Sequence, residues 1–155
     1  MQALATNVTL TEDADTYATS SMRDETVQTL GGNDTVDLAG YNSRNHIVDT
    51  GAGDDVLTMA NGSGMGNHTI SMGDGNDTIT AGYRTSQTVD MGAGDDTATT
   101  YVGNMNSSVM SAQRQQVNDW TGGEGNDTFS TNAASDTYHF NRGDGQDVIT
   151  DYDYG

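Results

Sequence analysis

One short pattern of glycine and aspartate recurs along this chain of 155 residues and restricts its fold more than any other feature. The pattern reads Gly-x-Gly-x-Asp and is followed by a short apolar stretch. Five good copies begin at Gly51, Gly73, Gly92, Gly123 and Gly143, and the segment 31–36 is a degenerate copy. A turn repeated in this way indicates a repeat architecture, in which each copy forms one small structural unit.

The apolar residues around these turns keep a constant spacing. One lies three residues before the first turn glycine, the other lies two residues after the turn aspartate, and the two are nine positions apart. The pairs are Val27/Val36, Val48/Leu57, Ile70/Ile79, Val89/Ala98, Trp120/Phe129 and Phe140/Ile149, and Val8/Tyr17 extends the series. This spacing predicts two short strands on opposite faces of a thin coil, with one apolar column in each sheet forming the whole core. The glycine density excludes a long helix.

The intervals between turn aspartates set the size of one coil. Successive turn aspartates are 21, 22, 19, 31 and 20 residues apart, so one coil takes about 20 residues and every Gly-Asp turn falls on the same edge. We therefore predict an all-β fold, a two-sheet β-solenoid of about seven coils, whose opposite edge is built from looser Gly/Asn/Ser turns. We interpret the long interval as a loop or bulge insertion near 101–117 on that looser edge, where insertions are tolerated.

This reading divides the chain into two parts. Residues 1–26 form a degenerate N-terminal capping coil, and residues 27–155 form the repeats proper. The chain stops at Gly155 without an obvious cap, so we expect a truncation at the C-terminus.

The charge of the chain narrows the range of partners. It carries 23 acidic and 5 basic residues, a net charge of −18, and only 32% hydrophobic residues. Such a composition predicts disorder unless something offsets the repulsion. Nucleic acid and anionic membranes need a basic surface, so we exclude both as partners. No apolar run is long enough to span a bilayer, and cations are the natural partner.

The turn chemistry points to calcium. Glycines permit positive φ and let carbonyl oxygens converge, and oxygen-only ligands from carbonyls and carboxylates suit Ca²⁺. Two stacked turn aspartates repel each other by ~1 kcal/mol in water and ~3–4 kcal/mol at an effective dielectric near 20. We predict about five Ca²⁺ ions, one between each pair of neighbouring coils, with a weaker sixth between Asp15 and Asp34. The predicted ligands are Asp34, Gly51, Gly53, Asp55, Gly73, Gly75, Asp77, Gly92, Gly94, Asp96, Gly123, Gly125, Asp127, Gly143, Gly145 and Asp147.

Residues 31–151 resemble the repeats-in-toxin (RTX, haemolysin-type) calcium-binding family, whose signature is Gly-Gly-x-Gly-x-Asp-x-U-x with U a large apolar residue. The resemblance implies a parallel β-roll, Ca²⁺ in the turns and export by type I secretion to the outside of a Gram-negative bacterium. The chain departs from the family at the first glycine: only Gly122 keeps it, and Thr50, Met72, Met91 and Arg142 replace it elsewhere. Family rolls usually carry Ca²⁺ turns on both edges, whereas here one edge lacks them.

The histidines and threonines outside the turns do not require a binding or catalytic role. His46 and His68 hold equivalent places on adjacent coils, and we expect a solvent-exposed stacked ladder in preference to a transition-metal site. Regular Thr rows after the turns fit ordinary β-propensity on an outer face. No His-Glu-x-x-His, Gly-x-Ser-x-Gly or cysteine nucleophile occurs, so we expect no enzyme activity.

These observations predict a calcium-dependent structural module of a secreted or cell-surface bacterial protein such as an adhesin, surface layer or extracellular filament. It would be unfolded at low calcium and folded outside the cell, because binding energy here is folding energy. Open coil ends favour head-to-tail self-association. The alternatives are the C-terminal export and folding domain of a type I-secreted hydrolase or toxin, and an ice- or carbohydrate-binding module on the outer Thr/Asn faces.

Overall fold

A computed structural model describes residues 6–19, 24–38, 44–59, 66–82, 86–100, 117–131 and 135–151. Within these ranges every regular element is a strand. The strands are β1 (Thr6–Thr9), β2 (Thr16–Ala18), β3 (Glu25–Gln28), β4 (Thr35–Leu38), β5 (Ile47–Asp49), β6 (Val56–Met59), β7 (Asn67–Ser71), β8 (Thr78–Ala81), β9 (Ser86–Ala93), β10 (Thr97–Thr100), β11 (Asn118–Glu124), β12 (Thr128–Thr131), β13 (Asp136–His139) and β14 (Val148–Asp151). In the part of the chain that is described, no helix is long and apolar enough to cross a membrane.

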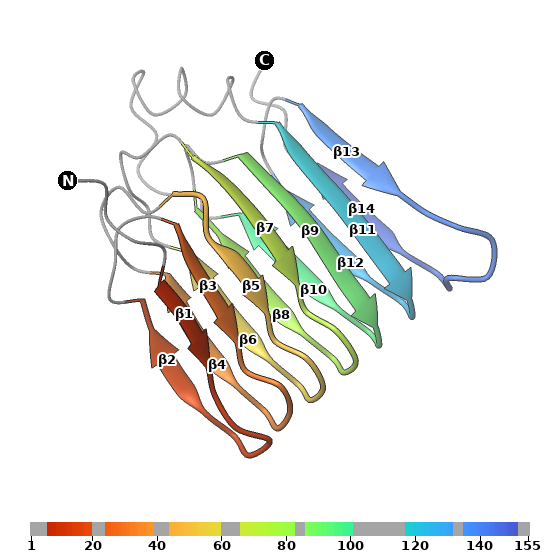
Figure 1. Ribbon diagram of the computed structural model, residues 1–155. Coiled ribbons are helices and arrows are strands. Elements are labelled where there is room, and N and C mark those ends of the chain that lie inside the picture. The colour runs from red at the N-terminus through yellow and green to blue at the C-terminus, as the bar shows by residue number, and fades with distance from the viewer. Residues whose placement is uncertain are drawn as a thin grey trace.

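The strands form two parallel sheets that face each other (Figure 1). The odd-numbered strands follow one another in the order β1-β3-β5-β7-β9-β11-β13, and the even-numbered strands form the second sheet in the matching order. The chain therefore alternates between the sheets, and each strand pairs in parallel with the strand one coil away. The predicted parallel β-roll is confirmed, and its two seven-stranded sheets agree with about seven coils. The proposed insertion near 101–117, except its last residue Val117, and most of the looser edge lie outside the described residues.

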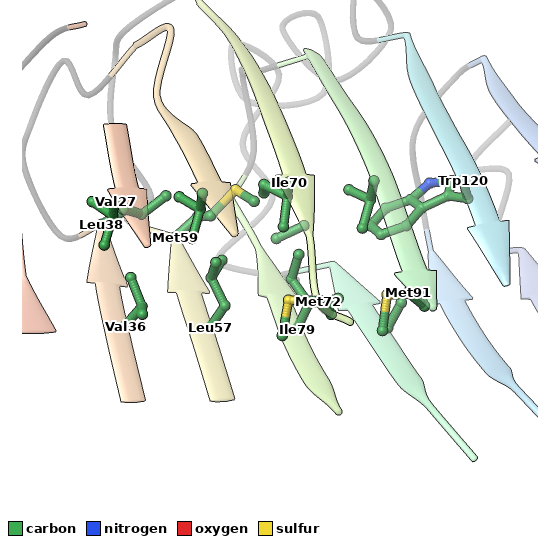
Figure 2. Packing of buried hydrophobic residues seen from close by; sticks show 14 of the residues in the cluster. Val27, Val36, Leu38, Leu57, Met59, Ile70, Met72, Ile79, Met91 and Trp120 are labelled. Atoms are coloured by element: carbon green, nitrogen blue, oxygen red, sulfur yellow. The ribbon is translucent and has the colours of Figure 1, made fainter. Parts of the chain in front are cut away.

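The expected apolar columns exist, and more lie beside them. Val27, Val48, Ile70, Val89 and Trp120 stack inside the odd sheet, and Val36, Leu57, Ile79, Ala98 and Phe129 stack inside the even sheet. Leu38, Met59 and Ala81 add a second buried column to the even sheet, and Met72 and Met91 lie buried just before their turns (Figure 2). The expectation of two columns alone was therefore wrong, because each short strand points alternate side chains inward.

In the last pair of the series, Ile149 lies in register with Phe129 as expected, but Phe140 was assigned wrongly. The register places Tyr138, not Phe140, opposite Trp120 in the neighbouring strand. Phe140 and Ile149 are each 43% exposed at the C-terminal end of the roll. Tyr138 is partly buried against the core, and its ring packs edge-on to Phe129 with the centroids 5.4 Å apart. The final turn is longer than the others, so the spacing of nine selected the wrong aromatic residue.

The turns need glycine because neighbouring coils nearly touch there. Gly73 has φ of 102°, and a Cβ on it would lie 1.8 Å from the carbonyl oxygen of Gly51 in the preceding coil. Leu30 takes the equivalent place in the degenerate first copy and is held at φ of 75°. Its backbone is therefore in the left-handed region that leucine rarely adopts.

Candidate metal centre

The turn aspartates form one column along an edge of the roll. Asp34, Asp55, Asp77, Asp96 and Asp127 are all at least 98% buried, and Asp147 is half-buried. In each neighbouring pair, the backbone N–H of one aspartate donates to Oδ1 of the aspartate one coil later, over 2.7–3.0 Å. The structure therefore brings all six predicted carboxylates together in one file.

The second carboxylate oxygen of these aspartates has no partner. Oδ2 of Asp34, Asp55, Asp77, Asp96 and Asp127 is buried and accepts no hydrogen bond. A buried acceptor without a donor loses about 1–3 kcal/mol of stability, and a charged one loses more. Five such oxygens recur at one position in five successive coils, so the column as a whole lacks a positive charge or a proton.

The turn glycines differ in what their carbonyls can offer. Gly51 and Gly73 already accept hydrogen bonds from the backbone N–H groups of Asp74 and Ala93. The second glycine of each turn is different: Gly53, Gly75, Gly94 and Gly125 carry carbonyl oxygens that accept no hydrogen bond within the described residues. The oxygen atoms in the turns that remain available to bind a metal are thus the carboxylate Oδ2 atoms and the carbonyl oxygens of the second glycines.

Burial makes a negative charge in this column unfavourable. Loss of solvent raises the pKa of Asp77 to about 6 and the pKa of Asp96 to about 7, and the charges of neighbouring aspartates push in the same direction. The pKa values of Asp55 and Asp127 are raised for the same first reason. The backbone N–H that each carboxylate accepts opposes the shift without cancelling it.

The N-terminal end of the column is closed differently. The backbone N–H of Asp15 donates to Oδ1 of Asp34 over 2.7 Å, so Asp15 belongs to the ladder. Its own Oδ2, however, accepts hydrogen bonds from the backbone N–H and the hydroxyl of Thr11. This carboxylate is occupied within its own turn, which separates it from the five aspartates with a partnerless oxygen.

A second ladder, which sequence reasoning missed, lies on the exposed side of the same turns. It uses the residue just before each turn aspartate, and its members are Asn33, Asp54, Asn76, Asp95, Asn126 and Gln146. Each backbone N–H donates to the side-chain oxygen one coil earlier, over 2.8–3.1 Å. Amide and carboxylate alternate along most of this file, so two carboxylates never stack directly in it. The alternation is visible in the sequence once the turns are aligned.

The histidines occupy a different environment from the one expected. The rings of His46 and His68 do stack, with centroids 5.3 Å apart and planes 2° from parallel. They are buried, however, with exposed fractions of 0% and 2%, so the prediction of a solvent-exposed ladder was wrong. The residue directly before each apolar column residue of the odd sheet is exposed or half-buried, whereas the residue two positions before it is buried. Gln87 and Asn118 continue this polar file in register.

The residues present fit a hard cation better than any other metal. The free donors of the turn column are oxygens only, as Ca²⁺ prefers, and no His or Cys lies in the turns. Within the described ranges, no group of three or more His, Cys, Asp or Glu side chains is placed to hold a metal ion. A cation here would therefore need carbonyl oxygens in addition to the carboxylates of two adjacent coils.

No family model, curated protein or solved structure matches the chain. The class of the protein is therefore defined by its architecture alone, and that class is the parallel β-solenoid of the β-roll type.

Proposed function

We propose that this chain is a calcium-dependent structural β-roll module of a secreted or cell-surface bacterial protein. Ca²⁺ would be held between neighbouring coils by Oδ2 of the column aspartates Asp34, Asp55, Asp77, Asp96, Asp127 and Asp147, together with the carbonyls of the second turn glycines. The resemblance to the repeats-in-toxin family supports both the ion and an extracellular setting reached by type I secretion.

The observation that carries this proposal is the file of five buried carboxylates with one partnerless oxygen each. Two unit charges about 5 Å apart repel by roughly 3 kcal/mol at an effective dielectric near 20. That repulsion repeats along the column and comes on top of the desolvation of every carboxylate. A divalent cation between coils replaces that repulsion by attraction, offsets the cost of desolvating the carboxylates, and supplies the missing partner of each oxygen.

This chemistry makes folding conditional on the surroundings. The low hydrophobic content leaves the core thin, so a chain without Ca²⁺ has little to offset its charge. Binding to the folded state alone stabilises it by mass action. The module would stay unfolded in a low-calcium cytoplasm and fold at the millimolar Ca²⁺ found outside cells, with the affinity of extracellular modules, ~0.1–1 mM.

The experiment that tests the proposal compares Asp77→Asn with the unchanged protein, in Ca²⁺ and in chelator, by circular dichroism and urea denaturation. Asparagine keeps the Oδ1 that accepts the N–H of Asp55 and removes the charge. We expect the variant to be less stable than the parent in Ca²⁺, because two adjacent sites lose a ligand. In chelator we expect circular dichroism to show a larger folded fraction for the variant than for the parent, because repulsion falls.

The matched control is Asp37→Asn, which removes one charge from the outer face of β4, away from the turns. Its effect should be small and have the same sign in both buffers. An Asp77→Asn variant that changes stability equally with and without Ca²⁺ would sink the proposal. Mg²⁺ serves as the second control, because it binds all-protein cages poorly.

A further inference from the structure

A file of polar side chains runs through the core of the odd sheet, close to the looser edge. It consists of Glu25, His46, His68, Gln87 and Asn118, each at most 2% exposed. These residues stand two positions before the apolar column residues Val27, Val48, Ile70, Val89 and Trp120. Polar groups buried in this way are usually fully hydrogen-bonded, so the exceptions in this file call for a chemical reason.

The hydrogen bonds around the two histidines are incomplete and depend on protonation. The backbone N–H of His46 donates to Nδ1 of His68 over 3.3 Å, so Nδ1 of His68 has to be unprotonated. Neither ring nitrogen of His46 has a hydrogen-bond partner. A proton added to Nδ1 of His68 removes its acceptor and sets two N–H groups against each other, and a proton on both rings places two cations 5.3 Å apart.

Charged groups lie beside His46 on the N-terminal side of the stack, and the carboxylates of Glu25 and Asp24 oppose the effect of burial on its pKa without offsetting it. Glu25 lies one coil before His46, and its Oε1 accepts a hydrogen bond of 2.8 Å from the Tyr17 hydroxyl. Asp24 lies near the surface beside it, where its Oδ1 accepts from Asn45, and Arg44 enters from the same edge with a buried Nε. On the C-terminal side His68 meets the neutral Gln87.

Among the residues that the structure describes, the facing sheet brings no compensating charge to this end of the core. Its buried residues at this end of the core are Leu38, Met59 and Ala81, which are all apolar. Burial lowers the pKa of His46, although the Glu25 carboxylate pulls it upward. Burial, followed by the neighbouring His46, lowers the pKa of His68 to about 4.

We propose that the buried His46–His68 stack makes this β-roll acid-sensitive, so that mild acid opens the coils carrying β5 and β7 independently of the metal at the opposite edge. In the folded state, burial disfavours a proton on either ring. In the unfolded chain both rings take up protons freely. Stability is therefore complete above the ordinary histidine value and falls as the pH drops from about 6.5 toward 4.

The direct test follows the ring C–H signals of the three histidines by NMR between pH 8 and 4, in whichever of Ca²⁺ or chelator gives a folded spectrum. His68 is 2% exposed and its Nδ1 accepts the backbone N–H of His46, so we expect its signal to stay at the neutral position until the roll opens. A His68 signal that moves to the protonated position while the roll is still folded overturns the proposal.

The second test uses the double variant His46→Gln/His68→Gln. The same file already holds Gln87 with the ring positions in register, so glutamine suits the space. For the parent, the shift of His68 from 6.5 to about 4 corresponds to a roughly 300-fold rise in the unfolding equilibrium constant over that pH interval. We expect the variant to lose this rise.

Comparing the two proteins in the same buffers removes every contribution from the aspartates, which both proteins share. Equal pH dependence of parent and variant between pH 6.5 and 4 overturns the proposal. The outcome does not depend on calcium: a protein that ignores Ca²⁺ can still show the histidine difference, and a calcium-dependent one can lack it. Should the double variant not fold, His68→Gln alone and the NMR titration decide the question.

Discussion

Gly73→Ala is the substitution whose effect the structure fixes most tightly. The new Cβ would lie 1.8 Å from the Gly51 oxygen, 2.7 Å from its carbonyl carbon and 3.2 Å from its Cα, and all three are backbone atoms. Ordinary contacts between a carbon and a carbonyl oxygen are about 3.3–3.6 Å. The two coils must therefore separate by roughly 1.5 Å at this turn.

That separation breaks specific hydrogen bonds. Asp74 N–H to Gly51 oxygen is 2.9 Å and Gly53 N–H to Asp74 oxygen is 2.7 Å, and both join these two coils at the turn. Each bond contributes ~0.5–1.5 kcal/mol, and alanine at positive φ adds ~1–2 kcal/mol of strain. We expect a total loss of about 2–5 kcal/mol, a large share of the ~5–15 kcal/mol that stabilises an average domain.

Gly143→Ala is the matched control. Gly143 has nearly the same φ, +106°, but no atom lies within 4 Å of its would-be Cβ. It should show the strain alone, ~1–2 kcal/mol. Urea denaturation of both variants in saturating Ca²⁺ gives the comparison. Equal losses in the two variants would refute the argument that coil contact, and not backbone conformation, is what demands glycine in these turns.

Three further outcomes follow from the same geometry. In chelator, the folded fraction should fall as the pH rises from about 4 to about 7, because Asp77 and Asp96 hold protons in the folded state that the unfolded chain has already released. Circular dichroism of the histidine double variant at several pH values measures this fraction, and saturating Ca²⁺ should abolish its pH dependence. Leu30→Gly should raise the thermal midpoint, because it relieves the positive φ and gives up little burial at 39% exposure; a lower midpoint would show that the leucine side chain matters more than its backbone. Asn76→Asp should lower the thermal midpoint at low salt and lower it less at high salt, because it adds a carboxylate beside that of Asp54 in the exposed ladder and removes an amide donor. Asn76→Gln is its control, and a loss that does not depend on salt would contradict the electrostatic cause.

The sequence was sufficient for the architecture because one coil repeats. The turn at Gly73–Asp77 and its copies give the direction of stacking, and the apolar pairs give the register, so few topologies remain. The nine-residue spacing rule failed in the last coil. There the turn is longer, and a rule based on Phe140 passed over Tyr138, which the parallel register selects.

The candidate site was foreseeable in its residues but not in its details. Aspartates at one position of a repeated turn have to form a file, and the file is there. Which oxygen is occupied depends on the coil-to-coil N–H of the next turn, and this needs coordinates. The polar file was missed because His68, Gln87 and Asn118 are of residue types that usually face water. Each stands two positions before an apolar column residue, Ile70, Val89 or Trp120, and this spacing puts its side chain in the core.

The aspartate ladder has a sense of direction. The backbone N–H of each turn aspartate donates to the carboxylate of the turn that comes later in the chain. Asp127 therefore donates its N–H to Asp147 and accepts the N–H of Asp96. Cutting away the last coil would leave the new terminal turn with a dangling donor, whereas trimming from the front would strip a donor from a carboxylate. The two ends of the roll are thus chemically different: truncation leaves an unpaired backbone N–H at the C-terminal end and a carboxylate without its N–H donor at the N-terminal end.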